Sequence, residues 1–464
     1  MIVNTCCGAV KGFNNREIHE FRGIPYAKAK RFGKPYTFQW SGILETYNYG
    51  DVALQINEGK IIGSEDCLNL NIITPDLTGN LPVMVEIHGG AFQMGSNQGM
   101  IDGVTRKYKD YVHVAINYRL GVMGFLSLEN LTNLGVLDQI VALEWIRKNI
   151  AFFGGDPEQI TLFGNSAGAK SIGALMVSPY SRHLFNQVIL SSGAIQGIRT
   201  NETAVVLRDS YLEHLSLSSI NELFDCDASI LLEAQKEWCQ DKESTCFFGP
   251  VIDGDIIPVN WEEELSKGNG FRGRAIIGSN ERECLGLRGK DNFLNKIHEI
   301  AFELFGNYSK YAIDTFYKEV TQEDSKEVLE DKWVQIFSDY MYRTHSLRLA
   351  RILSGLQQKV WFYNFTYKPA DHALDIRILN GDYEKEQGNL SEDKVRDIIK
   401  IRETLEEIYH NFIVNKDPNA STIPFWEEYK LSNPKSLVIG KDVELKEQIP
   451  TEYYTNFPNS SISL

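Results

Sequence analysis

Short runs of apolar and β-branched residues recur along the 464-residue chain, and several of them end in small or polar residues. We interpret four such runs, 81–87, 160–163, 274–278 and 360–365, as strands, because short apolar runs bounded by turn residues are typical of buried strands. The stretches from about 200 to 270 and from about 285 to 355 carry mostly helical patterns instead. The candidate chemistry lies in the residues that follow the four strands.

The run 160–163 leads into residues 164–168, which read G-N-S-A-G and precede a helical stretch of small residues. A strand, a sharp turn and a helix form the context of a nucleophile elbow, in which a serine hydroxyl stands clear of the sheet. Small neighbours are needed there because the strand and the helix cross closely. The helix N-terminus favours developing negative charge. Ser166 is therefore a candidate nucleophile, and a serine that caps a glycine-rich turn is the alternative.

A second glycine-rich turn follows the run 81–87 and reads His88-Gly89-Gly90-Ala91-Phe92. It resembles the loop in which α/β-hydrolases hold part of the oxyanion hole. Such a hole needs backbone N–H groups that converge about 3 Å from the attacked oxygen, and side chains would obstruct that approach. A flexible turn is the alternative. We expect His88 to be structural, because it precedes both the loop glycines and the serine.

The chain order of such hydrolases places the acid and then the histidine after the serine. The histidines beyond the serine are His183, His214, His298, His345, His372 and His410. Three of these lie in helical patterns, and two precede the strand that is expected to carry the acid. His372 lies beyond the run 360–365 and a break at Pro369, on a loop after a strand end. It is the candidate general base, with a surface loop histidine as the alternative.

The acid is also expected to follow a strand, and Glu281 and Glu283 both follow the run 274–278. The pattern alone favours neither glutamate. Asp253 and Asp255 lie in a glycine-flanked turn, which they are more simply expected to shape.

Longer motifs are spread over nearly the whole chain. They are Phe21-Arg22-Gly23-Ile24-Pro25-Tyr26-Ala27, Ser64-Glu65-Asp66-Cys67-Leu68-Asn69-Leu70, Asn117-Tyr118-Arg119 with Gly124-Phe125-Leu126, Phe153-Gly154-Gly155-Asp156-Pro157, Ser191-Ser192-Gly193-Ala194, and Asp417-Pro418-Asn419 with Pro424 and Trp426. Together they resemble the type-B carboxylesterases, the family of cholinesterases and bacterial para-nitrobenzyl esterases. The resemblance implies an α/β-hydrolase fold, with a mostly parallel twisted β-sheet flanked by helices, as a single domain over 1–464. The helical stretches 200–270 and 285–355 are then insertions that wall a substrate gorge.

The resemblance also assigns the site. It implies Ser166 as nucleophile, His372 as general base and acid, and Glu283 as the acid, so Glu281 becomes a surface residue. The oxyanion donors would be the N–H groups of Gly90, Ala91 and Ala167. The implied activity is hydrolysis of small carboxylic esters through an acyl-enzyme, without a metal or organic cofactor.

Three departures from the family pattern alter this expectation. Asn165 stands where the family usually has Glu, and Leu285 follows Cys284 where it usually has Gly. For Asn165 we expect altered hydrogen bonding and pH dependence rather than loss of activity, and at Leu285 we expect a different local loop. The segment 54–66 is short and has no aromatic residue, so a choline-binding tryptophan is not expected there.

The cysteines and the N-terminus bear on the compartment. There are seven cysteines, and the position where secreted relatives bridge the Cys67 thiol reads Ala53-Leu54-Gln55. With the adjacent Cys6 and Cys7, this favours free thiols, although Cys226, Cys239 and Cys246 leave pairing open. No signal peptide is recognisable, so we expect a cytoplasmic, bacterial protein.

The formal net charge of −15 argues against nucleic acid and anionic membranes as partners. No apolar stretch has membrane-spanning length. The expected partner is a small ester, and the expected state is a monomer or homodimer. Two alternatives stay open: a non-catalytic adhesion or binding protein of the same fold, and an acyl-serine enzyme that acts on amides, carbamates or lactones.

Overall fold

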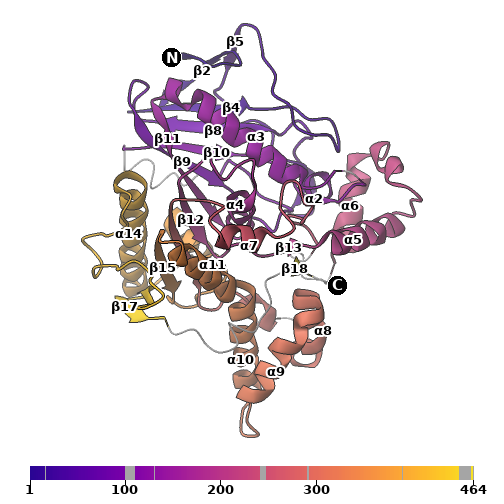
Figure 1. Ribbon diagram of the computed structural model, residues 1–464, viewed down its shortest axis with the longest axis vertical. Helices are drawn as coiled ribbons and strands as arrows, with labels where there is room; N and C mark the ends of the chain where they lie inside the picture. The colour runs from indigo at the N-terminus through magenta and orange to yellow at the C-terminus, as the bar shows by residue number, and fades with distance from the viewer. Residues whose placement is uncertain are drawn as a thin grey trace. The chain divides into compact units, whose positions relative to one another are not determined.

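The computed structural model describes residues 1–15, 17–99, 110–129, 131–240, 247–289, 292–388, 390–448 and 461–462. The chain divides into two compact units. Their helices and strands are labelled in Figure 1. Unit 1 comprises Met1–Val188 and Gly197–Arg272, and unit 2 comprises Ile189–Gln196 and Gly273–Leu464. The expected single domain over 1–464 stays a prediction.

The core of unit 1 is a sheet whose strands run in the order β11-β9-β10-β8-β4-β3. Their bounds are β3 (Phe13–Asn15), β4 (Ile18–Pro25), β8 (Asn69–Thr74), β9 (Leu81–Ile87), β10 (Val112–Ile116) and β11 (Gly155–Asn165). The strands β11, β9 and β10 are parallel, and β8, β4 and β3 extend the sheet by antiparallel pairing. Every residue of β8 and β10 is buried, which is the burial of strands covered on both faces.

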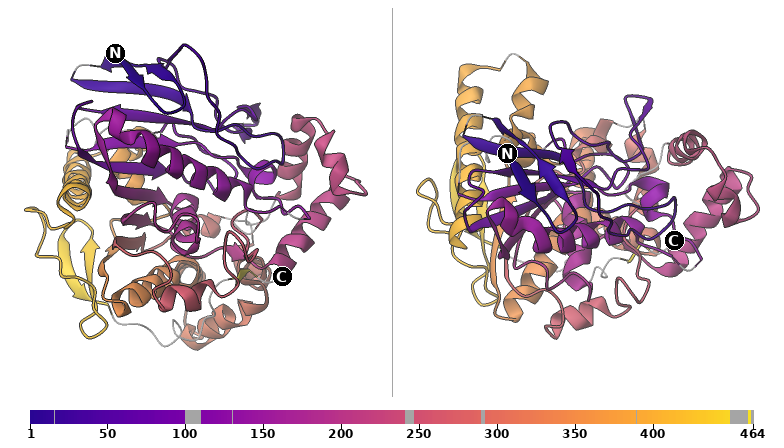
Figure 2. Two further views of the ribbon diagram at one scale, coloured as in Figure 1. Left: turned by 45° about the horizontal axis from the view of Figure 1, so that its top comes forward. Right: turned by 90° about the horizontal axis from the view of Figure 1, so that it is seen from above.

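Smaller strands and several helices complete unit 1. The strands are β1 (Ile2–Asn4), β2 (Ala9–Lys11), β5 (Ile43–Glu45), β6 (Gln55–Asn57), β7 (Lys60–Ile62) and β13 (Ile198–Arg199), and β12 (Gln187–Ser191) lies where the chain passes into unit 2. The helices are α2 (Gly121–Phe125), α3 (Leu134–Asn149), α4 (Ala167–Val177), α5 (Asn201–His214), α6 (Ala228–Trp238) and α7 (Trp261–Ser266), with single turns η1 (Ile150–Phe153) and η2 (Ile220–Phe224). All of α4 is buried against β9 and β11, whereas α5 and α6 lie to one side of the strands (Figure 2).

The strands of unit 2 run in the order β17-β16-β15-β14. Their bounds are β14 (Arg274–Asn280), β15 (Lys359–Phe365), β16 (Lys435–Ile439) and β17 (Val443–Glu447), and a short β18 (Ser461–Ile462) lies near the end of the chain. The first three are parallel neighbours, and β17 pairs antiparallel with β16.

Helices make up most of unit 2. They are η4 (Leu285–Gly289), η5 (Phe293–Lys296), α8 (Ile297–Phe305), η6 (Gly306–Tyr308), α9 (Ser309–Glu319), α10 (Lys326–Ser338), the wider turn η7 (Asp339–Arg343), α11 (Thr344–Gly355), α12 (Leu374–Asn380), α13 (Asp382–Gln387) and α14 (Glu392–Asn415). Helix α11 packs on β14 and β15, and α8, α9 and α10 gather at one end of the unit. Helices thus fill much of 200–270 and 285–355, and their role as gorge walls stays a prediction.

The topology explains where the candidate residues meet within each unit. In unit 1 the parallel neighbours β9 and β11 end in the loop of Gly90 and in Ser166. In unit 2 the parallel neighbours β14 and β15 precede Glu283 and His372. The carboxyl ends of parallel strands share one edge of a sheet, which is where α/β proteins place their sites.

Candidate active site

Ser166 occupies a strained turn between β11 and α4. Its backbone has φ 55° and ψ −121°, a conformation that residues with a Cβ rarely adopt. Helix α4 starts at once, since the Lys170 N–H donates to the Ser166 carbonyl at 3.0 Å. Within the described residues of α4, however, no N–H donates a capping hydrogen bond to the Ser166 hydroxyl. The strain therefore serves something other than a helix cap, and strained residues of this kind gather at active sites.

Two glycines allow this turn because their neighbours leave no room for a side chain. A Cβ on Gly164 would lie 2.5 Å from the carbonyl carbon of Gly168, and a Cβ on Gly168 would lie 2.0 Å from the Ile87 carbonyl oxygen. Both obstacles are backbone atoms, which cannot rotate away as a side-chain tip does. The spacing of the G-x-S-x-G sequence thus reflects direct contact between β11, α4 and the end of β9.

The loop after β9 lies against the elbow. A Cβ on Gly89 would be 2.6 Å from the Asn165 carbonyl oxygen and 3.4 Å from the Ser166 Cβ. The next three residues, Gly90, Ala91 and Phe92, all have positive φ, at 113°, 53° and 60°. The N–H groups of Gln93 and Met94 both donate to the Gly90 carbonyl, at 2.9 and 3.0 Å, and fix the turn. A backbone held in this way can present N–H groups without intervening side chains.

His88 packs beside this loop and holds it through contacts with Tyr118 and Gly89. Its ring stacks on Tyr118 with centroids 4.5 Å apart, and its Nδ1 lies 2.8 Å from the Gly89 carbonyl. The Tyr118 hydroxyl donates to the His88 carbonyl at 2.7 Å. Burial lowers the pKa of His88 to about 4, so the ring is neutral near pH 7 and donates from Nδ1.

In unit 2 a buried carboxylate holds the candidate base. The Glu283 side chain is fully buried, and its Oε2 lies 2.6 Å from His372 Nδ1. The Asn280 N–H donates to the other carboxylate oxygen at 2.7 Å. Glu281, the other candidate, forms an ion pair with Lys368 instead. Of the two glutamates that the pattern left open, Glu283 is thus the one that contacts the histidine.

Two loops of unit 2 hold this pair in register through backbone contacts. The Arg282 N–H donates to the Ala370 carbonyl at 2.9 Å, and the Asn280 side chain donates to the Asp371 carbonyl at 2.6 Å. The His372 ring lies 5.2 Å from that of Tyr342, and about a third of the histidine side chain is exposed. In the tautomer that donates from Nδ1 to Glu283, Nε2 is the ring nitrogen that can accept a proton.

A comparison with protein-family models identifies the family of this chain. The model described as "Carboxylesterase family" matches residues 1–457. The chain belongs to the carboxylesterase family. It is 28% identical to para-nitrobenzyl esterase of Bacillus subtilis over 483 residues, which cover 97% of each chain. It is 30% identical to liver carboxylesterase 1 of Oryctolagus cuniculus over 481 residues, or 88% of this chain and 83% of the relative.

Solved structures agree on the fold. A carboxylesterase of Geobacillus stearothermophilus superposes with a TM-score of 0.85 and 27% identity, covering 98% of this chain and all of that one. A para-nitrobenzyl esterase gives a TM-score of 0.83 and 28% identity, with 96% and 97% covered. The fold is therefore that of an α/β-hydrolase, as expected, and this member of the family is a carboxylic ester hydrolase.

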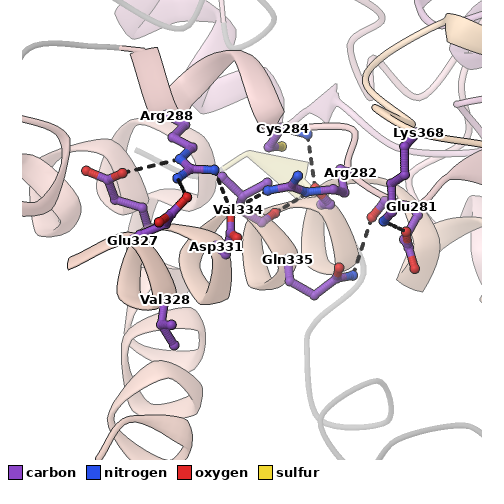
Figure 3. A network of polar contacts seen from close by, with 12 residues as sticks. Glu281, Arg282, Cys284, Arg288, Glu327, Val328, Asp331, Val334, Gln335 and Lys368 are labelled. Carbon is purple, nitrogen blue, oxygen red and sulfur yellow. Dashed lines mark hydrogen bonds and ion pairs between the residues drawn. The ribbon is translucent and has the colours of Figure 1, made fainter. Parts of the chain in front are cut away.

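Sequence reasoning missed a charged network that anchors the loop carrying Glu283 (Figure 3). Arg282 and Arg288 both form ion pairs with Asp331 of α10. Arg288 also reaches Glu327 at 3.0 Å and Glu330 at 3.3 Å. Glu327, Glu330 and Asp331 have the spacing of one helix face, and this spacing was visible in the sequence. It did not show that arginines would be their partners.

Further contacts tie the same loop to α10. The Cys284 N–H donates to Ser338 Oγ at 3.0 Å, and the Gln335 amide donates to the Glu281 carbonyl at 3.4 Å (Figure 3). The loop with Leu285, where the family usually has Gly, is thus fixed on both sides of Glu283.

A second buried carboxylate lies in the first turn of α12, three residues after the candidate base. Asp375 is fully buried, and its Oδ2 accepts hydrogen bonds from Ser191 Oγ at 2.7 Å and the Tyr363 hydroxyl at 2.9 Å. Its Oδ1 has no hydrogen-bond partner among the described residues. Burial, and then the charge of Glu283, raises the pKa of Asp375. The sequence showed this residue beside His372 but gave it no role.

Among the described residues, no group of three or more His, Cys, Asp or Glu side chains could hold a metal ion. No described helix is both long and apolar enough to cross a membrane. Cys67 is a buried free thiol whose pKa is raised by burial, and Cys246 lies outside the described residues.

Proposed function

We propose that the protein hydrolyses small, neutral, fairly apolar carboxylic esters through an acyl-enzyme on Ser166. The observation that carries this proposal is the strained Ser166 backbone, at φ 55°, in a member of the carboxylesterase family. Strain without a capping role favours a nucleophile over a structural turn. The pair Glu283–His372, joined at 2.6 Å, supplies the base that a serine hydroxyl needs.

In the proposed acylation, His372 Nε2 takes the Ser166 proton as the hydroxyl oxygen attacks the ester carbonyl. Glu283 fixes the imidazole tautomer through Nδ1–H and stabilises the imidazolium ion. The C–O bond to the alcohol then breaks, and the alcohol leaves with the proton from His372. Water repeats the sequence on the acyl-enzyme and releases the acid.

The N–H groups of Gly90, Ala91 and Ala167 are the proposed donors to the tetrahedral oxyanion. The positive φ of Gly90 and Ala91 and the position of Ala167, which opens α4 directly after the serine, support this proposal. Loss of one such donor typically costs about 3 kcal/mol of transition-state stabilisation, or a hundredfold or more in rate.

The two alternatives differ in what they require. A binding protein of this fold needs no nucleophile, whereas the sequence has Ser166, Glu283 and His372 where the family resemblance implies a nucleophile, an acid and a base. An acyl-serine enzyme for amides, carbamates or lactones needs the same three residues, so substrate panels must separate it from an esterase. The cytoplasmic, bacterial location and the monomeric or homodimeric state are proposals too, the former supported by the free thiol of Cys67.

The experiment is hydrolysis of p-nitrophenyl esters from acetate to octanoate by the wild type and by Ser166→Ala. We expect turnover that depends on acyl length and disappears in the variant, while p-nitroanilide amides of the same acids react far more slowly. A folded wild type that cleaves none of the esters would overturn the proposal and leave the binding protein as the better account.

A further inference from the structure

Two adjacent thiols lie in unit 1, in the turn between β1 and β2. The Sγ atoms of Cys6 and Cys7 are 3.6 Å apart. The Cys6 side chain is exposed, and Cys7 is buried. Neither residue belongs to the elbow or to the oxyanion loop, so the proposed hydrolysis does not account for the pair.

The backbone around the pair is fixed by hydrogen bonds. The Cys6 N–H donates to Asn149 Oδ1 at 2.8 Å, and the Cys7 N–H donates to Thr5 Oγ1 at 3.1 Å. The Cys7 carbonyl accepts from the Trp40 N–H at 2.9 Å. A site whose groups are already in place loses little conformational entropy when it binds a ligand.

This geometry disfavours a direct bond between the two sulfurs. Adjacent residues joined by a trans peptide have Cα atoms about 3.8 Å apart, below the usual 4.4–6.8 Å of disulfides. The one cis peptide bond among the described residues is Lys368–Pro369, so the Cys6–Cys7 peptide is trans. A disulfide would also require the sulfurs to approach to about 2.05 Å.

A thiophilic atom between the sulfurs needs no such movement. Two bonds of about 2.3 Å, the length of zinc–thiolate bonds, span the observed 3.6 Å with an angle of roughly 100°. Zinc itself completes four ligands, and no cluster of three or more suitable side chains exists among the described residues. An atom that requires two sulfurs and no other protein ligand fits better.

We propose that Cys6 and Cys7 form a binding site for trivalent arsenicals that carry one organic substituent. In the reaction two As–O bonds of the arsonous acid R–As(OH)₂ break and two As–S bonds form. Each hydroxyl leaves as water with one thiol proton. Arsenic stays trivalent throughout, so no oxidant or reductant is needed.

The two thiols play different parts. Cys6 is exposed and forms the first As–S bond, and Cys7 then closes the ring from the protein side. Burial, and then the neighbouring Cys6, raises the pKa of Cys7 to about 11. The Cys7 thiol is therefore protonated at neutral pH. Its proton joins the departing hydroxyl, which leaves as water.

The test uses phenylarsine oxide with the whole reduced protein, read by intact mass after dialysis against a monothiol. We expect one phenylarsenic group per wild-type chain, released by a small dithiol such as 2,3-dimercaptopropanol. Cys6→Ser and Cys7→Ser should each retain the group at least about a hundredfold more weakly, because the second bond of a chelate forms within one molecule. Thermal unfolding of both variants checks that they fold.

Cys226→Ser and Cys67→Ser are the matched controls, and both should retain the group as the wild type does. Loss of the group from the wild type in monothiol would overturn the proposal. Unchanged retention by a folded Cys6→Ser variant, or loss in Cys226→Ser, would place the binding elsewhere and overturn it equally.

Discussion

The two units hold their candidate residues by different means. In unit 1 the backbone holds the candidate residues: Ser166 and the loop at Gly90 have positive φ angles, and nearby glycines touch the neighbouring main chain. In unit 2 side chains add to the backbone contact between the two loops: His372 is held by Glu283, and Glu283 lies in a loop that arginines anchor to α10. Tight backbone packing leaves no room for an added atom, whereas a network of charged side chains loses its effect one contact at a time. The two parts should therefore fail differently.

The largest effect is expected from Gly168→Ala in unit 1. The new Cβ would lie 2.0 Å from the Ile87 carbonyl oxygen, so β9 and α4 must separate. Overpacking of this kind should destabilise the protein by about 3 kcal/mol or more and abolish ester hydrolysis. Urea unfolding and p-nitrophenyl acetate turnover measure both. Gly355→Ala, where a Cβ meets nothing within 4 Å, is the control. A stable, active Gly168→Ala would refute the backbone account of the elbow.

The next effect concerns the acid in unit 2. Glu283→Gln keeps the shape of the side chain but removes the charge that stabilises the imidazolium, so kcat should fall by about 10⁴-fold with the fold intact. Glu281→Gln, two residues earlier, loses only the surface pair with Lys368 and should stay close to the wild type. Steady-state kinetics of the two variants compare them directly. Equal losses would mean that the 2.6 Å contact to His372 is not what selects the acid.

A smaller effect, in pH dependence, is expected from Asp375→Asn. When ionised, the buried Asp375 carboxylate adds negative charge near Glu283, and its other neighbours are Ser191, Tyr363 and Tyr409. The burial that raises the pKa of Asp375 also limits the screening of its charge. Because negative charge favours imidazolium, and the reaction needs neutral imidazole, its removal should move the acid limb of kcat/KM to lower pH.

The pH profile of kcat/KM from pH 4 to 9 gives the readout, in steps of about half a unit around the acid limb. Asp371 pairs with Arg377 near the same histidine and stays in place in both proteins. Asp382→Asn, a surface change in α13 opposite Lys385, is the control and should leave the profile unchanged. An acid limb that Asp375→Asn leaves in place, or moves upward, would contradict the electrostatic role.

The smallest effect is expected from the network on α10. Asp331 is nearly half exposed, so its pairs with Arg282 and Arg288 are screened by solvent. A double-mutant cycle on kcat with Arg282→Ala and Asp331→Ala should give a coupling of about 1 kcal/mol or less, and high salt should reduce it. Asp314→Asn on α9 should change nothing. A coupling that salt leaves unaltered would argue against an ionic anchor.

The difference between the units also explains what the sequence could predict. Glycine contacts and strained turns leave local motifs, so the strand before Ser166, the elbow and the glycine-rich loop were recognisable from pattern. His372 was recognisable as a loop residue after a strand. The residue pattern alone could not choose between Glu281 and Glu283, because the turn after β14 decides which one meets the histidine. Only the family resemblance named Glu283.

Local sequence patterns could not predict the ion pairs of the network on α10. Arg282 and Asp331 are 49 residues apart in sequence, and periodicity carries no information on such pairs. The role of Asp375 was not predictable for the same reason, because its hydrogen-bond donors are Ser191 and Tyr363, which lie on two separate strands. Side-chain networks that join distant segments are fixed only once the strands are in place.

The most direct measurement is covalent labelling with diethyl p-nitrophenyl phosphate, which releases p-nitrophenolate when a serine nucleophile attacks phosphorus. The account predicts a burst of one equivalent per chain, with the diethylphosphoryl group mapped to Ser166 by peptide mass spectrometry. The Ser166→Ala variant should give neither burst nor label. A label on another serine, or a folded wild type that takes up none, would contradict Ser166 as the nucleophile.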